Sequence, residues 1–560
     1  MFNKRLVSLL LAVTVVCGAS WAQNYAKRAR EFFKAKTGRT LSLSVGQETE
    51  NCVMLKNDIR GCFVLMCKQE FDSILASPVL AYSGESSTSF SDGSHADMKI
   101  MKYYDRVLTE IKEKGAAYRD VLGMQGKVSP LISPLCLSQQ KVDLSIVGMQ
   151  GTVLAGCVPI AATQLMYYYS WPEQAEGSFA YYRSEDVSGI VKMDGINFSW
   201  PETLELSKDR HFVIPKPFIA LNGMLFDANF GESGTTANLK KSKRPFINHY
   251  RYSRKMCFDW VHDDSLLLST VKSELEASRP VILARWQHAF VCDGYEDGYL
   301  HFNMGWGGYF NGFFRIFPDM GHSGEDDFFD IVCGITPEKN TKFTGKSVSL
   351  TEPGTLASHI TDEDFNTLDS LCVEGLINGK DIALLRQLAG AAGVDVPFEK
   401  RGVLRVLDLG KATIVAAKDE YYVQRGIVMT HKEWADCHEY NNCYVEEVVP
   451  DKQYSYHYFT NKQTVGYFMF QDCDNLETLV IPSDTKKIMF EAFSYCTSLR
   501  RFVVPSSVTT YSTRLFEHCM MLETVSVPKD GMGISPNYKN PESDMYWGRN
   551  GYPYMQIVEY

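Results

Sequence analysis

The sequence has no block of basic residues, and its charges are dispersed along the whole chain. Its 57 lysines and arginines are outnumbered by 67 aspartates and glutamates, which gives a formal net charge of -10 over 560 residues. Because proteins that bind nucleic acid usually carry a clustered basic surface, this distribution argues against a nucleic-acid partner. Motifs for common cofactors are also missing: there is no HExxH sequence, no P-loop and no dinucleotide-binding glycine run. We therefore expect a protein that needs no cofactor.

Long apolar runs are equally scarce, and the run near the N-terminus is too short to span a membrane. Basic residues precede an apolar stretch from Leu6 to Val16, and Ser20-Trp21-Ala22 then fits a small-x-small cleavage site. A spanning helix needs about 20 apolar residues, so this pattern indicates a secretory signal peptide over residues 1–22. Lipidation at Cys17 is an alternative, although Val16 stands where a small residue is normally found. The mature protein is expected to be secreted or at the cell surface, with no integral membrane segment.

The sequence also lacks the cysteine pattern of a disulfide framework. The chain has 15 cysteines, but they are not spaced as in a small disulfide-rich scaffold. Large domains bury enough surface without covalent cross-links, so we predict few or no obligatory disulfides. His431, Cys437, His438 and Cys443 could form a metal site or could have surface or packing roles. Their spacing matches no zinc pattern, which favours the second interpretation.

The length predicts roughly three to four domains. After the signal peptide comes a small mixed pattern, with helices expected over Tyr25–Lys36 and Met98–Lys114 and buried strands over Gly61–Cys67 and Val79–Tyr82. A unit of this kind between a signal peptide and a catalytic domain is typical of a pro-segment. The predicted boundaries are 23–126 for the pro-domain, 127–340 for the catalytic domain, 341–450 for a linker with the first part of a repeat region, and 451–560 for the repeats.

The C-terminal region repeats itself every 23 residues. The pattern Leu476-Glu-Thr-Leu479-Val-Ile481 recurs from Leu499 and from Leu522, and Leu404–Leu409 carries an earlier copy. Three further residues of each unit keep the same period: Pro482, Pro505 and Pro528; Phe470, Phe493 and Phe516; Cys473, Cys496 and Cys519. A period of about 20–29 residues with L-x-x-L-x-L spacing is the leucine-rich-repeat signature, in which each unit buries its apolar edge on the next. The repeated cysteines are therefore expected to be small buried side chains.

Cys157 stands at the start of a predicted helix. Apolar residues recur at helical spacing from Val158 onwards, and Trp171-Pro172 ends the pattern. Pro159 suits the first helical turn, where its missing N–H has no consequence. The positive end of the helix dipole favours the thiolate form of Cys157 that a sulfur nucleophile needs, and Gly156 leaves room for a substrate carbonyl. A buried structural cysteine is an equal alternative on this pattern alone.

A histidine and an asparagine further along the chain favour the nucleophile. His288 begins a predicted strand, and the side-chain carbonyl of Asn303, one hairpin away, can accept from an imidazole nitrogen and fix its tautomer. Trp306 can shield that bond from water. His288 follows Cys157 by 131 residues, within the 130–150 typical of the papain pattern. Cysteine, histidine and asparagine in this order can form a thiolate–imidazolium pair with an orienting amide.

These motifs resemble the streptopain family of papain-like bacterial cysteine peptidases. The resemblance rests on Gly156-Cys157-Val158, His288-Ala-Phe-Val291 and Phe302-Asn-Met-Gly-Trp-Gly-Gly308, and covers roughly residues 23–320. It implies an α+β fold: a papain-like peptidase domain with an α+β pro-domain, here followed by the leucine-rich-repeat solenoid. It also implies an endopeptidase acting on proteins or peptides, whose own pro-domain blocks the cleft as an intramolecular inhibitor until it is cut off near residues 115–127.

The resemblance further implies an oxyanion-hole glutamine ahead of the nucleophile. Gln139 and Gln140 are the candidates, with Gln140 slightly preferred, in a segment that departs from the usual aromatic-containing pattern. Gln287 and Met304 are two other departures, which bear on the substrate pocket. They keep open an alternative function, that of a catalytically impaired homologue acting as a surface binding protein. The repeats resemble those of bacterial surface adhesins and are expected to bind a protein at a host or cell surface.

Overall fold

The structure, a computed structural model, describes residues 23–57, 62–75, 77–84, 94–114, 125–132, 141–143, 152–184, 187–198, 200, 216–226, 228–230, 235–261, 264–285, 288–316, 329–339, 341–391, 400–425, 443–448, 453–512, 514–519, 521–528 and 556–560. The chain forms two compact units. The first comprises Met1–Trp171, Ser199–Lys240 and Phe258–Cys333, and the second comprises Pro172–Phe198, Lys241–Cys257 and Gly334–Tyr560. In the part of the chain that the structure describes, no helix is both long and apolar enough to cross a membrane.

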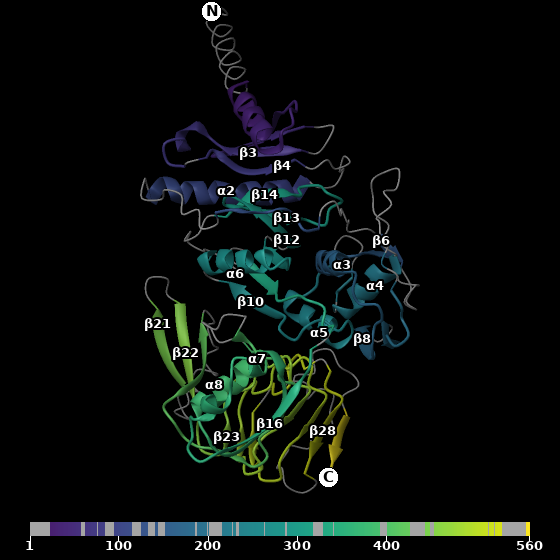
Figure 1. Ribbon diagram of the computed structural model, residues 1–560, viewed down its shortest axis with the longest axis vertical. Coiled ribbons are helices and arrows are strands. Elements are labelled where there is room, and N and C mark those ends of the chain that lie inside the picture. The colour runs from purple at the N-terminus through teal and green to yellow at the C-terminus, as the bar shows by residue number, and fades with distance from the viewer. Residues whose placement is uncertain are drawn as a thin grey trace, which may run out of the picture. The chain divides into compact units, whose positions relative to one another are not determined.

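One large sheet organises the first unit (Figure 1). Its strands, in spatial order, are β1 (Ser44–Glu48), β2 (Cys52–Lys56), β3 (Phe63–Cys67), β4 (Val79–Ser83), β14 (Gly312–Arg315), β13 (Tyr299–Asn303), β12 (His288–Glu296), β11 (Val281–Arg285), β15 (Phe329–Cys333) and β10 (Cys257–Val261). The pairing of β4 with β14 joins the N-terminal segment to the later strands in a single hydrogen-bonded sheet. The short strand β5 (Lys127–Val128) pairs with β12. The predicted strands of the pro-segment correspond to β3 and β4.

Helices accompany this sheet in the first unit. They are residues 23–37, α2 (Ser94–Lys114), α3 (Cys157–Tyr169), α4 (Lys216–Leu225) and α6 (Asp264–Glu276). The helix α3 packs against β12 and α4, and α6 packs against β11, β12 and β15. The two helices expected in the pro-segment and the helix expected after Gly156 are all present. The short strands β6 (Lys141–Asp143) and β7 (Thr152–Leu154) pair with each other just before α3.

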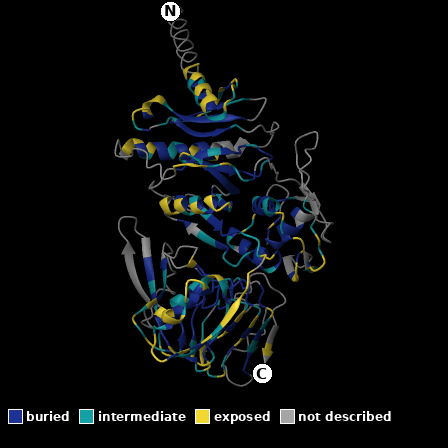
Figure 2. Cartoon of the chain, viewed as in Figure 1, coloured by how far each residue is buried: buried dark blue, intermediate teal, exposed yellow. Residues whose placement is uncertain are grey.

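The N-terminal segment is part of the core of the first unit. Both β3 and β4 are wholly buried, as Figure 2 shows in dark blue. The hydroxyl of Tyr104 in α2 donates to the carbonyls of Leu80 at 3.2 Å and Arg315 at 2.8 Å, and that of Tyr299 donates to the carbonyl of Val79 at 2.9 Å. Residues from both ends of this unit therefore complete each other's hydrogen bonds.

The second unit is a parallel solenoid. Its main sheet runs β16 (Thr344–Leu350), β17 (Leu368–Ile377), β18 (Val406–Asp408), β24 (Thr478–Val480), β26 (Arg501–Val503), β28 (Thr524–Val527) and β29 (Gln556–Glu559), with β19 (Ala412–Ile414) beside β17. A second parallel sheet is formed by β23 (Thr464–Val465), β25 (Lys487–Ile488) and β27 (Thr510–Tyr511). The predicted earlier copy at Leu404–Leu409 is present as the strand β18 and its flanking residues.

Other elements interrupt or flank the coils of the solenoid. They are α7 (Asp364–Thr367), α8 (Gly379–Leu388), the antiparallel strands β20 (Glu420–Arg425), β21 (Cys443–Val448) and β22 (Gln453–Phe459), and, from earlier in the chain, α5 (Lys243–Asn248) with the pair β8 (Ser178–Ser184) and β9 (Val187–Lys192). The last three lie within residues that the sequence placed in the catalytic domain. By packing, the segments 172–198 and 241–257 belong with the repeats.

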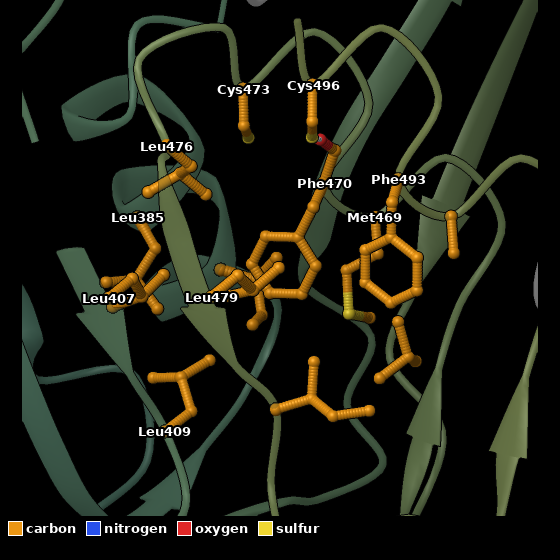
Figure 3. Close-up of a cluster of buried hydrophobic side chains, with 14 of the residues drawn as sticks. Leu385, Leu407, Leu409, Met469, Phe470, Cys473, Leu476, Leu479, Phe493 and Cys496 are labelled. Carbon is orange, nitrogen blue, oxygen red and sulfur yellow. Dashed lines mark hydrogen bonds between the residues drawn. The ribbon is translucent and has the colours of Figure 1, made fainter. Parts of the chain in front are cut away.

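The repeated side chains form ladders inside the solenoid (Figure 3). Phe470 and Phe493 stack with ring centroids 6.2 Å apart, and Phe493 and Phe516 with centroids 5.3 Å apart. The thiol of Cys496 donates to the carbonyl of Phe470, and that of Cys519 to the carbonyl of Phe493, each at 3.1 Å. The prediction of small buried cysteines is confirmed. Every cysteine whose side chain the structure describes is a free thiol.

Candidate active site

Cys157 is the first residue of α3, and Gly156 is its N-cap. Gly156 has φ 80°, a left-handed conformation that side chains disfavour, and a Cβ there would lie 2.9 Å from Cγ2 of Thr235. Residues Val158–Met166 of the helix are all buried, so α3 is held on every side over its first turns rather than along one apolar face. The sequence thereby places Cys157 at a helix start whose position is fixed by packing.

The sulfur of Cys157 lies beside the strand that carries His288. Burial raises the pKa of the Cys157 thiol, while the backbone amides of Ala289, Val158 and Cys157 itself act in the opposite direction. The amides at the helix start therefore favour the thiolate as the sequence predicted, but in this state burial outweighs them. Ala289 directly follows His288, so its contact with the sulfur brings the predicted nucleophile and base to one site.

His288 is held by a backbone carbonyl. Its Nε2 lies 2.8 Å from the carbonyl oxygen of Met304. Because a carbonyl can only accept, Nε2 carries the proton and Nδ1 retains the free lone pair that a base requires. Burial lowers the pKa of His288 to about 4; the bond to Met304 opposes this shift and the charge of Lys99 in α2 adds to it. Among the described residues, no hydrogen bond links His288 to Cys157.

Asn303 does not supply the acceptor that the sequence assigned to it. Its Oδ1 accepts from the backbone N–H of Gly305 at 3.2 Å, and Met304 supplies the carbonyl for Nε2 instead. The reason is local: the chain turns at Gly305, where φ is 69°, and this turn brings the Gly305 N–H to the Asn303 side chain. Asn303 is buried and remains next to the site.

Trp306 covers the imidazole. The rings of His288 and Trp306 stack with centroids 4.3 Å apart and planes inclined by 25°. A Cβ on Gly305 would lie 2.8 Å from Cγ2 of Ile160, so the turn that carries Trp306 packs closely on the nucleophile helix. The sequence assigned Trp306 to shielding a bond between His288 and Asn303; in the structure Trp306 stacks on His288, whose Nε2 is bound to the Met304 carbonyl instead.

Several predicted residues lie outside the described part of the chain. They are the glutamines Gln139, Gln140 and Gln287, the signal peptide with Cys17, and three residues of the alternative metal site, His431, Cys437 and His438. Where the structure describes the chain, it contains no cluster of three or more histidine, cysteine, aspartate or glutamate side chains able to hold a metal ion.

Two groups near His288 were not predicted from the sequence: the Met304 carbonyl and the Asn311 side chain. It treated Met304 as a pocket residue, although the role visible here belongs to its carbonyl. It passed over Asn311, whose Oδ1 accepts from the Met304 N–H at 2.9 Å. An asparagine that closes a glycine-rich turn is a recognisable signal of such a bond.

Two regions of the chain match known protein families. Residues 138–314 match the Peptidase C10 family, and residues 455–538 match six copies of the BspA type leucine rich repeat region. The resemblance predicted from the motifs is confirmed, as are the papain-like α+β fold class and the leucine-rich repeats.

The chain is similar to curated proteins that are cysteine peptidases. It is 30% identical over 214 residues to "Thiol protease/hemagglutinin PrtT" of Porphyromonas gingivalis, covering 33% of this chain and 24% of that protein. It is 26% identical over 213 residues to "Streptopain" of Streptococcus pyogenes, covering 34% of this chain and 52% of that protein. The chain thus spans about half or less of these relatives. A solved structure of a Prevotella intermedia prointerpain A fragment is 17% identical, with a TM-score of 0.44, over 53% of this chain and 99% of that one.

Proposed function

We propose that this chain is a secreted cysteine endopeptidase made as a zymogen, with Cys157 as nucleophile and His288 as general base. The observation that supports this most directly is the meeting of two elements. The start of α3 places the sulfur of Cys157 against the amide of Ala289, and the preceding His288 has its Nε2 proton bound to a carbonyl, which leaves Nδ1 as an acceptor.

The chemistry follows from these positions. Nδ1 of His288 takes the proton of the Cys157 thiol, and the thiolate attacks the carbonyl carbon of a substrate peptide bond. The backbone N–H of Cys157 and the side chain of Gln140, or of Gln139, hold the developing oxyanion; such a donor stabilises the transition state by about 3–4 kcal/mol in well-studied cases. The imidazolium then protonates the leaving amine, and water releases the acyl group from sulfur.

The zymogen is supported by the sheet of the first unit. The segment 23–114 contributes the four strands β1–β4 to the sheet that carries His288, and it also contains the helix α2. Glu296 of β12 binds Lys36 of this segment through one carboxylate oxygen at 2.9 Å and Lys127 through the other at 3.0 Å. The raised pKa of Cys157 and the lowered pKa of His288 both favour the neutral thiol–imidazole pair over the reactive ion pair in this state.

The solenoid gives the chain a second role in this proposal. Its parallel coils expose strand side chains on one continuous sheet, an arrangement that suits protein binding. We assign to it the binding of a protein at a host or cell surface, which holds the peptidase near its substrates. The apolar N-terminal run serves as the export signal.

The test compares two cysteine variants of the full chain. Cys157→Ala should abolish casein hydrolysis, and the pro-segment should stay attached if maturation is autocatalytic. Cys372→Ala is the matched control, because Cys372 in β17 is, like Cys157, a free thiol of intermediate exposure. A thiol-directed epoxide should inhibit the wild type and the control alike. Hydrolysis that survives in Cys157→Ala would refute the proposal and favour the binding-protein alternative.

A further inference from the structure

The peptide acceptor of His288 is itself held at two points. Asn311, which is 1% exposed, accepts the Met304 N–H through Oδ1 at 2.9 Å. Asn303 accepts the next N–H along the chain, that of Gly305. The Met304 carbonyl, which receives the proton of His288, belongs to the same peptide unit as the Gly305 N–H. Both N–H groups that flank this carbonyl residue are therefore bound by buried asparagine side chains.

The turn between these asparagines needs such a constraint. Gly305, Gly307, Gly308 and Phe310 all have positive φ, at 69°, 65°, 88° and 59°. Glycine gives a turn conformational freedom, and a phenylalanine in the left-handed region carries strain. Backbone bonds from Tyr309 to Trp306, at 3.2 Å, and from Asn311 to Gly308, at 3.3 Å, close only the middle of the turn. The Asn311 side chain bridges its two ends.

The Asn311 bridge affects His288 through the Met304 carbonyl. The bond from Nε2 of His288 to the Met304 carbonyl fixes the tautomer and raises the pKa of the imidazole against the effect of burial. Hydrogen bonds in series polarise one another, so an N–H that is bound at Gly305 makes the carbonyl of its peptide unit a better acceptor. A Met304 residue free to rotate would lose that orientation.

We propose that Asn311 is a positioning residue of the active site: by holding the Met304 N–H, it aims the Met304 carbonyl at Nε2 of His288. This leaves Nδ1 as the acceptor for the proton of the thiol and stabilises the imidazolium during catalysis. The inference rests on the proposed function of Cys157 and His288. Asn311 reaches His288 only through the backbone.

The experiment uses two substitutions of opposite character in the full chain, matured and assayed with a peptide substrate. Asn311→Leu keeps the approximate size but removes the acceptor, and we expect kcat to fall about 10-fold or more with KM nearly unchanged. The basic limb of the pH profile should move to lower pH, because the imidazolium loses a stabilising bond. Asn311→Asp keeps an acceptor, so kcat should stay within about 3-fold of wild type with the basic limb at equal or higher pH.

The control separates loss of stability from loss of positioning. Asn378 is the N-cap of α8 in the second unit, where its side chain accepts from Lys380. Asn378→Ala should lower the melting temperature, since a lost cap costs about 1 kcal/mol, and leave both the kcat and the pH profile unchanged.

The outcomes are distinct. Wild-type kcat and pH profile in Asn311→Leu would overturn the inference while Cys157→Ala, inactive in parallel, leaves the proposed function standing. Activity in Cys157→Ala would remove the proposed function itself. If Asn311→Leu does not mature, Asn311→Asp decides: retained kcat supports positioning, and a loss of about 10-fold or more with an unmoved basic limb overturns it.

Discussion

Two histidines in the molecule are each held by a hydrogen bond to a backbone carbonyl. His288 and His249 each point one ring nitrogen at a backbone carbonyl, that of Met304 at 2.8 Å and that of Glu176 at 2.9 Å. Burial lowers the pKa of each to about 4. For His249 the Glu176 carbonyl and Asp194 oppose the shift, while Arg244 and Arg500 add to it. Both rings are therefore neutral at pH 7, and the carbonyl decides which nitrogen is protonated.

His249 makes the second unit sensitive to acid. Its folded-state pKa of about 4 lies below the ordinary value of 6.5, so the unfolded chain binds the proton more tightly. The contribution of neutral His249 to the free energy of unfolding is therefore fully present above about pH 6.5 and is lost as the pH falls towards 4. Between pH 7 and pH 5 the free energy of unfolding should fall by about 2 kcal/mol. His249→Asn keeps a donor for Glu176 and should flatten this dependence, measured as urea midpoints at the two pH values. The exposed His359, changed to Asn, should leave it as in wild type; equal slopes in all three proteins would contradict the prediction.

Gly156 is a single residue on which the nucleophile helix depends. A side chain at its φ of 80° is strained, and its Cβ would meet Thr235 at 2.9 Å. Gly156→Ala should destabilise the fold by about 1–3 kcal/mol and displace Cys157, lowering peptidase activity. Gly195 has a similar φ of 85° with nothing within 4 Å of a Cβ, so Gly195→Ala carries the strain without the contact. Equal loss of activity in the two variants, compared by melting temperature and casein hydrolysis, would show that the contact with Thr235 has no effect.

At the scale of elements, the parallel coils place equivalent residues side by side. The paired residues Ser370, Val406, Thr478, Arg501 and Thr524 occupy one position of successive coils. The residues directly before them are Asp369, Arg405, Glu477, Arg500 and Glu523, which alternate in charge along the stack. Arg405 contacts Asp369 at 2.9 Å and Glu477 at 3.6 Å, and Arg500 contacts Glu523 at 3.3 Å. Like charges at this spacing would repel, so the alternation supports the register of the strands.

Reversing one charge tests this ladder. Glu477→Lys places a cation next to Arg405 and Arg254, each within 3.7 Å of the present carboxylate, and should lower the free energy of unfolding by about 1 kcal/mol at low salt. The loss should shrink at high salt because the charges are partly exposed. Glu523→Lys, near the end of the ladder, faces Arg500 and should lose less. Chemical denaturation at two salt concentrations measures both, and a larger loss at Glu523 would contradict the ladder.

At the scale of the whole molecule, the second unit incorporates earlier parts of the chain. Lys243 of α5 is buried, with its Nζ 3.6 Å from the carboxylate of Asp474. Nδ2 of Asn475 donates to the carbonyl of Arg254 at 3.1 Å, and Lys255 donates to that of Arg401 at 2.6 Å. The segment 241–257, which precedes His288 in the chain, thus finds its partners among the repeats.

Because the segment 241–257 depends on these contacts, we expect the repeats to be required for the stability of the fold. A chain that ends at residue 340 loses the partners of Lys243 and Arg254, and we expect a lower soluble yield and a melting temperature reduced by about 5 °C or more. Removal of 556–560 alone, which takes away only the terminal strand β29, should have a smaller effect. A fragment 23–340 as stable as the full chain would contradict the expectation.

The sequence by itself determined the elements and their chemical content. The 23-residue period predicted the solenoid, because each repeat places equivalent residues in equivalent environments. The helical spacing after Gly156 placed Cys157 at the start of α3, because this spacing is a local property of the sequence. The order of Cys157, His288 and Asn303 along the chain predicted the resemblance to cysteine peptidases, which the match of residues 138–314 to the Peptidase C10 family confirms. The positions of Gln139 and Gln140 stay predictions.

Only the tertiary structure decided how these parts act on one another. The direction of the Cys157 pKa follows from burial, which depends on strands far away in sequence. The acceptor of His288 is the carbonyl of Met304 rather than Asn303, because backbone dihedrals of a glycine-rich turn set where a carbonyl points, and side-chain identity does not. The segments 172–198 and 241–257 joined the repeats for the same reason: packing between distant segments, and not their place in the chain, determines which core they complete.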